Sequence, residues 1–167
     1  MIYNKLVYPV LFGLAILLPS CYSFRGISID RNVSTYYVEN FKNNAVNSLP
    51  AMEQLFTEGL KEKIRTDTRL IYNDETPDIE FKGTLVDFRI SSEAPQPGEL
   101  VAINRLTIVL AIEFINHLDE EKNWRNNFSH FFDFSSSTDF AAVQDEAVDA
   151  IQLQLMEDIF NKAFTDW

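Results

Sequence analysis

Apolar and polar residues alternate along three stretches of the chain, which is the spacing of half-buried β-strands. The longest alternation, from Leu106 to Phe114, places large apolar residues on one side and smaller or polar residues on the other. A second runs from Ile79 to Ile90 and changes phase between Gly83 and Val86, which predicts a β-bulge. The third, from Trp124 to Phe134, has aromatic residues at most of its apolar positions.

Helical spacing replaces this alternation between Met52 and Ile64, where apolar residues recur every three or four positions. Ser48 lies just before this segment and is expected to cap the helix, with Pro50 in its first turn. The pattern ends near Thr66.

A second helix is predicted from Asp139 to Phe164, with side-chain oxygens of 135–138 to cap its start. Weaker strand compositions lie at 27–38 and 69–72. The predicted order is therefore strand, helix, three or four strands and helix. This order favours an α+β fold, in which two helices pack on one face of a mostly antiparallel sheet of about four strands in a single domain.

The N-terminal apolar run, 6–19, is too short to span a membrane. It is typical of a signal peptide, and the residues Leu18-Pro19-Ser20-Cys21 that end it are typical of a bacterial lipoprotein signal. Cys21 is the only cysteine and has no partner for an internal disulfide, so we predict that its thiol carries covalent lipid. The alternative is an ordinary secretory signal with an incidental cysteine.

Cleavage before Cys21 divides the chain into a signal peptide (1–20), a lipidated tether (21–26) and an α+β domain (27–167). Tyr22 follows the lipidated residue, where an Asp commonly favours retention in the inner membrane. We therefore expect a lipid-anchored protein of the outer membrane that faces the periplasm.

The composition indicates a packed globule with an acidic surface, since 46% of the residues are hydrophobic and 13% aromatic. The formal charge is −11, and removal of 1–20 leaves 13 basic against 25 acidic residues, or −12. This balance argues against nucleic acid, which proteins bind by neutralising phosphates. It also argues against a surface that adheres to anionic lipid without an anchor.

Catalytic and metal-binding patterns are missing from the sequence. His117 and His130 have no metal-ligand spacing, and no Ser-His-Asp set, glycine-rich phosphate loop or CxxC pair is present. We therefore predict a protein that is not an enzyme and has no metal or cofactor beyond its lipid. The acidic residues of the last helix are interpreted as a solvated helix face rather than a calcium or acid/base site: Asp145, Glu146, Asp149, Glu157 and Asp158.

Basic residues are concentrated in one place, in and just after the last turns of the first helix: Lys61, Lys63, Arg65 and Arg69. Cations stabilise a helix C-terminus through its dipole, which accounts for them without a ligand. The alternative is a site for the phosphate of a lipid headgroup, with Arg89 and Arg105 as weaker candidates for the same role.

Five segments, taken in chain order, cover nearly the whole mature chain: Cys21-Tyr22-Ser23-Phe24-Arg25-Gly26, Tyr37-Val38-Glu39-Asn40-Phe41, Phe56-Thr57-Glu58-Gly59-Leu60, Asn104-Arg105-Leu106-Thr107-Ile108 and Asp158-Ile159-Phe160-Asn161-Lys162-Ala163-Phe164. Together they resemble the LptE family, the lipoproteins of lipopolysaccharide assembly in Gram-negative outer membranes, and particularly its acidic branch.

The resemblance implies a fold of two helices on a four-stranded sheet. It also implies a non-enzymatic role, in which the chain plugs the large outer-membrane β-barrel LptD, supports its assembly and can contact lipopolysaccharide. The alternatives are a stand-alone periplasmic lipid-binding lipoprotein, which needs an apolar cavity, and an accessory lipoprotein of another envelope assembly complex.

Overall fold

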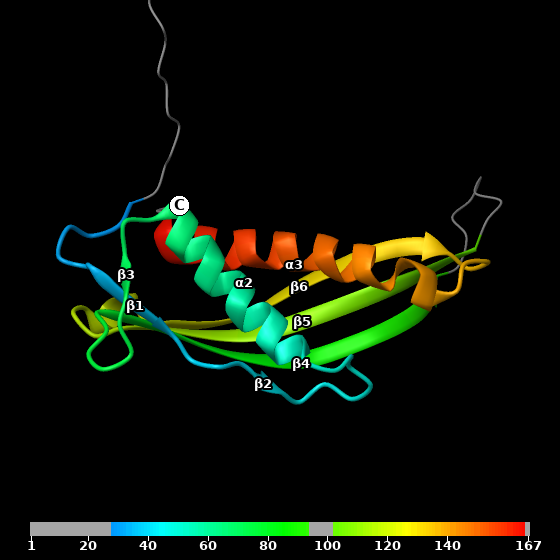
Figure 1. Ribbon diagram of the computed structural model, residues 1–167, viewed down its shortest axis with the longest axis horizontal. Helices are drawn as coiled ribbons and strands as arrows, with labels where there is room; N and C mark the ends of the chain where they lie inside the picture. The colour runs from blue at the N-terminus through cyan, green and yellow to red at the C-terminus, as the bar shows by residue number, and fades with distance from the viewer. Residues whose placement is uncertain (1–27, 94–101, 166–167) are drawn as a thin grey trace, which may run out of the picture.

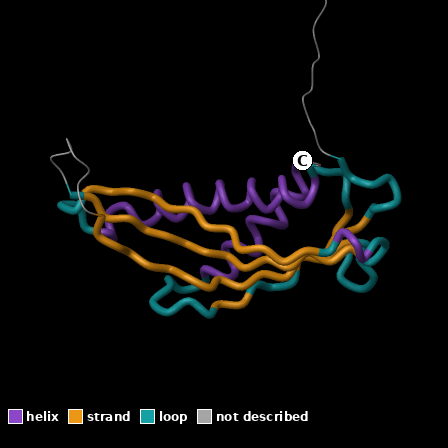
Figure 2. Tube along the Cα trace, turned by 180° about the vertical axis from the view of Figure 1, so that it is seen from behind, coloured by secondary structure: helices purple, strands orange, loops and turns teal. Residues whose placement is uncertain are grey.

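The computed structural model describes residues 28–93 and 102–165, and this part of the chain forms a six-stranded sheet with two long helices on one face (Figure 1). The sheet curves around the helices, so its helix-free face is convex (Figure 2). The elements in chain order are β1 (Thr35–Val38), β2 (Lys42–Asn43), α2 (Met52–Asp67), β3 (Ile71–Tyr72), β4 (Ile79–Glu93), β5 (Ile103–Asn116), the 3₁₀ helix η1 (Glu120–Lys122), β6 (Trp124–Ser135) and α3 (Phe140–Phe164).

The strands follow the order β3-β1-β4-β5-β6, and β2 pairs with β4 beyond the end of β1. The three long strands β4, β5 and β6 are antiparallel neighbours, whereas β1 lies parallel to β3 and β4, and β2 lies parallel to β4. The α+β class and the single domain are confirmed. The expected sheet of about four mostly antiparallel strands is wrong, because α2 returns the chain in the same direction and makes its flanking strands parallel.

The predicted bulge is present in β4. The pairing of β4 with β5 shifts register between Leu85 and Asp87, which leaves Val86 unpaired and 39% exposed. Leu85 before it and Phe88 after it are both buried. The extra residue therefore restores the inward direction of the apolar side chains, as the phase change in the sequence requires.

The core lies between the sheet and the helices. The covered face of β5 buries its apolar residues from Leu106 to Phe114, as the alternation predicts. Phe56, Leu60 and Ile64 of α2 are completely buried in the same core. The space between the two layers is thus filled by side chains of both helices and the three long strands.

The start of α2 differs from the prediction. The helix begins at Met52, and the residue before it, Ala51, has a left-handed backbone (φ 62°) and no side-chain cap. Ser48 lies outside the helix, where its Oγ accepts a hydrogen bond of 2.7 Å from the side-chain amide (Nδ2) of Asn43. Pro50 precedes the first helical residue instead of occupying the first turn. The apolar face of the helix and its end at Asp67 agree with the sequence pattern.

The cap of α3 is Asp139, whose carboxylate accepts a hydrogen bond of 3.1 Å from the Ala141 amide. The expected caps in 135–138 are wrong: Ser135 ends β6, and its hydroxyl accepts from the Ser137 amide in the turn that follows. The helix covers 25 residues and buries its stripe from Ala147 to Phe164 on the sheet.

The first strand is shorter than the predicted 27–38, because a turn closed by a 3.0 Å hydrogen bond from the Val33 amide to the Asp30 carbonyl precedes it. The carboxylate of Asp78 accepts hydrogen bonds from the amides of Ser34 (2.8 Å) and Thr35 (2.9 Å). These bonds lower the pKa of Asp78, the Ser34 amide most strongly, and they join the start of β1 to the start of β4.

Candidate functional site

The predicted lipid attachment site, Cys21, lies outside the described residues, as do the signal peptide and the tether. The described chain starts at Ser28, whose amide donates a hydrogen bond of 2.7 Å to the carbonyl of Phe164. The start of the described domain therefore lies at the C-terminal end of α3, far from the end of the sheet where β4 stops at Glu93 and β5 begins at Ile103 (Figure 1). In the described ranges, no helix is long and apolar enough to cross a bilayer.

Two of the four predicted phosphate-binding residues point in different directions from α2. Lys61 lies 3.0 Å from Glu58, with its ammonium 5.7 Å from the ring centre of Tyr72. Lys63 binds both Asp67, at 2.7 Å, and Glu157 of α3. Burial lowers the pKa of Lys63, but its hydrogen bonds to these two carboxylates outweigh burial and raise that pKa overall.

The other two cations are paired as well. Arg65 donates three hydrogen bonds to Glu62, at 3.0, 2.7 and 2.6 Å, and Arg69 donates one of 3.0 Å to the backbone carbonyl of Asp30. The four residues thus face separate partners instead of converging on one anion-sized position. Their role in binding a lipid phosphate stays a prediction.

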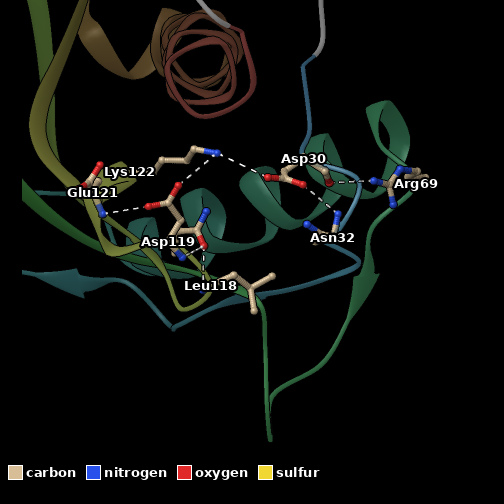
Figure 3. A network of polar contacts seen from close by, with 8 residues as sticks. Asp30, Asn32, Arg69, Leu118, Asp119, Glu121 and Lys122 are labelled. Carbon is tan, nitrogen blue, oxygen red and sulfur yellow. Dashed lines mark hydrogen bonds and ion pairs between the residues drawn. The ribbon is translucent and has the colours of Figure 1, made fainter.

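The contact of Arg69 belongs to a polar network where the tether enters the domain (Figure 3). The carboxylate of Asp30 accepts a 3.0 Å hydrogen bond from the Asn32 amide, which lowers its pKa, and lies 3.7 Å from the ammonium of Lys122. Lys122 also lies 3.5 Å from Asp119, in the turn before β6. The network ties the N-terminal segment to two loops, and sequence spacing gave no sign of it because its members are far apart in the chain.

The histidines contact carboxylates at the surface, and the acidic residues of α3 are either paired there or exposed to solvent. His130 lies 2.8 Å from Asp158 and connects β6 to α3, and His117 lies 3.3 Å from Glu80. Within 28–93 and 102–165, no three His, Cys, Asp or Glu side chains are placed to hold a metal ion. Of the acidic residues singled out on α3, Glu157 and Asp158 are paired, and the remaining three are exposed: Asp145, Glu146 and Asp149.

The helix-free face of β4, β5 and β6, called the outer face below, carries every charged residue of these strands. Glu113 binds Arg125 at 2.6 Å, and Arg105 binds Asp133 at 2.7 Å. The guanidinium of Arg105 also lies 3.8 Å from the ring centre of Phe131, which is 54% exposed. Negative and positive charges almost balance on this face, with five acidic and four basic residues: Glu80, Lys82, Asp87, Arg89, Glu93, Arg105, Glu113, Arg125 and Asp133.

The hollows of the described domain are surface depressions. One of about 580 Å³ lies on the outer face around Thr84, Ala111 and Asn127, and one of about 350 Å³ lies at the tether end beside Trp124. A third of about 600 Å³ lies between the exposed sides of α2 and α3, next to Leu55. None of the three lies in the packed core.

Comparison with known proteins agrees with the sequence resemblance. The family model described as "LptE: Lipopolysaccharide-assembly" matches residues 33–163. None of the curated proteins matches the chain.

The comparison with solved structures finds matches at low sequence identity and with TM-scores just below 0.5. The hypothetical protein CT253 from Chlamydia trachomatis is 7% identical, with a TM-score of 0.49 over 78% of this chain and 98% of that one. A minor lipoprotein from Acinetobacter baumannii is also 7% identical, with a TM-score of 0.48 over 80% and 98%. The PelC dodecamer from Paraburkholderia phytofirmans is 9% identical, with a TM-score of 0.49 over 83% and 93%.

Proposed function

The chain belongs to the LptE lipopolysaccharide-assembly family, and we propose from this membership that it is a non-enzymatic lipoprotein that plugs and supports assembly of an LptD-like outer-membrane β-barrel. The observation that carries the proposal is the family match over 33–163, which includes both helices and all six strands of the described sheet. A family of this kind works in the cell envelope. The finer assignment, an outer-membrane protein that faces the periplasm and the barrel lumen, is part of the proposal.

The outer face supports the role of a plug. Lumens of outer-membrane barrels are polar, and the outer face offers a convex surface of paired charges such as Glu113 with Arg125 and Arg105 with Asp133. A surface of this kind can remain in contact with a polar, concave wall without burying unpaired charge. The second supporting feature is the filled core, which makes the domain a solid body.

The filled core disfavours the main alternative, a stand-alone lipid carrier. A carrier needs an apolar cavity of several hundred cubic ångströms between sheet and helices. The side chains in that space are packed against each other, and Phe81, Leu110 and Leu155 have no exposed surface. The hollows of about 580 and 600 Å³ lie on the surface instead, and charged residues such as Lys82 and Arg125 line the one on the outer face.

The decisive experiment purifies the native chain from outer membranes in mild detergent and identifies stoichiometric partners by mass spectrometry. We expect a one-to-one complex with a large β-barrel protein. Recovery of the chain alone, or with a different envelope complex, would contradict the barrel assignment and leave the family intact.

The lipid anchor needs a test of its own. Several acyl chains on Cys21 would hold the domain at the membrane, since each buried methylene contributes about 0.8 kcal/mol. We expect Cys21→Ser to block maturation and to move the chain out of the membrane fraction. Unchanged processing and fractionation would show that Cys21 carries no lipid, whatever the partner proves to be.

A further inference from the structure

The two edges of the sheet are built differently. One edge consists of β1, β2 and β3, which are only four, two and two residues long. The other edge is β6, whose 12 residues from Trp124 to Ser135 pair with β5 without a register shift. In the described part of the chain, β5 is the one strand that pairs with β6. Such an edge presents a row of unpaired backbone groups that can pair with another chain.

Natural edge strands usually carry features that prevent such pairing, including short length, a bulge, proline or lysine. The first edge is interrupted, and the bulge at Val86 lies on β4 beside it. β6 has the sequence WRNNFSHFFDFS, with no proline, lysine or bulge. The open edge of the sheet is therefore the one suited to strand addition.

The sequence of β6 complements itself when two copies run antiparallel. If Ser129 lies opposite Ser129 of a second copy, Arg125 lies opposite the second copy's Asp133, and the reverse pair forms by symmetry. A shift of two residues loses both pairs, because it places Arg125 opposite Phe131 or Ser135. Charge complementarity thus selects one register and one kind of partner, namely another copy of this chain.

Charges on the neighbouring strands extend this match. Lys82, Glu113 and Arg125 occupy consecutive positions across β4, β5 and β6 on the outer face. In the second copy, Asp133 and Arg105 occupy consecutive positions across β6 and β5. In this register the five residues form one row of alternating charge across the joined sheet, and the two-fold axis passes midway between the two small Ser129 residues.

We propose that β6 is a self-association surface, through which two copies pair antiparallel about Ser129 into one continuous sheet. Both copies keep their helices on the same side, because opposed residues in this register lie on the same face of the sheet. The interface is isologous, so it closes at two copies. This inference goes beyond the proposed function and does not depend on the identity of any barrel partner.

Disulfide trapping tests the register. Opposed side chains in antiparallel strands have Cβ atoms about 4.5–5.5 Å apart, so Ser129→Cys in the full lipidated chain should link two copies under a mild oxidant such as diamide. Asn127→Cys is the matched control on the same face, because two such residues would be offset by four positions, or about 13 Å. We expect a reducible dimer for Ser129→Cys, several-fold more abundant than for Asn127→Cys. Equal cross-linking of the two variants would overturn the proposal.

Charge reversal gives a second, independent readout. Arg125→Glu opposes two acidic residues across the interface and Asp133→Arg opposes two basic ones, so each variant alone should self-associate about tenfold more weakly. An equimolar mixture of the two variants restores opposite charges at both positions and should recover dimers that contain one copy of each. Sedimentation in mild detergent measures these masses, and circular dichroism checks that both variants are folded.

A wild-type chain that stays monomeric at about 100 μM, or a mixture that fails to recover dimers, would overturn the proposal. Pairing of β6 with a strand of the barrel protein would appear as amide protection in β6 only when that protein is present, and it would also exclude a second copy. If no barrel protein is recovered with the purified chain, the proposed function is contradicted, whereas the expected cross-linking and sedimentation results of β6 stay the same.

Discussion

The two faces of the three long strands differ in role: one packs into the core, and the other is exposed to solvent. On the covered face, Phe81 and Leu110 have no exposed surface, and they pack against the helices. On the outer face, their chain neighbours Lys82 and Ala111 border a polar depression. Because successive side chains of a strand point to opposite sides, stability and recognition can change separately in these strands. Substitutions on the covered face should therefore change stability far more than substitutions on the outer face.

The largest difference should come from neighbouring residues of β4. Phe81 contacts the rings of Phe114 and Phe164, so Phe81→Ala should lower the free energy of unfolding by about 3–5 kcal/mol. Lys82→Ala, on the other face, should change it by less than about 0.5 kcal/mol. Urea denaturation of the mature chain measures the free energy of unfolding of both variants. Similar decreases for the two would refute the view that the covered face contributes more to stability than the outer face.

A smaller decrease in the free energy of unfolding is expected from a substitution at Gly83, which also lies on the covered face. A Cβ placed there would lie 2.5 Å from ring carbons of Phe41, which is buried. Gly83→Ala should therefore cost about 1–3 kcal/mol through overpacking. In a Phe41→Leu background the same change should cost less, and an equal cost in both backgrounds would show that the ring is not the cause.

At the boundary of the sheet, Asp78 should contribute about 1 kcal/mol through its hydrogen bonds to the amides of Ser34 and Thr35, after allowance for its exposure. Since the pKa of Asp78 is lowered in the folded protein, this stability is present above the ordinary Asp pKa of about 4. It is lost as the pH falls through the lowered value. The difference between wild type and Asp78→Ala should shrink between pH 5 and pH 2, as followed by urea titrations; a constant difference would exclude the charged carboxylate as its source.

The smallest effect should come from the outer face itself. The pair of Arg105 and Asp133 is two-thirds buried by side-chain area, with 31% and 33% exposed. A double-mutant cycle to alanine should give a coupling energy smaller than each of the losses above, which decreases further in high salt. A coupling energy as large as the loss at Phe81 would place structural importance on a face that we assign to contacts with other molecules.

Local patterns of apolar and polar residues were sufficient to predict the long strands and helices. The phase change between Gly83 and Val86 predicted the bulge, because only an extra residue can return Phe88 to the core. The alternation of β5 and the stripe of α3 were equally informative, since each element buries one side.

Long-range contacts decided the features that the sequence did not predict. The start of β1 is held by hydrogen bonds to Asp78, which lies more than 40 residues away. Parallel pairing of β1 with β4 depends on where α2 returns the chain, and two-residue strands such as β2 have no periodicity to detect. The basic residues from Lys61 to Arg69 formed a cluster in sequence, but their partners separate them in space.

The hydrogen bond from Ser28 to Phe164 brings the two ends of the described domain together. The polypeptide is therefore almost a closed ring, and a short linker between Thr165 and Ser28 would complete it. A circular permutant opened between Glu93 and Ala102 would keep every strand pairing of the sheet while starting at the opposite end of the molecule. Such a permutant would separate the folding of the domain from the place where it is tethered.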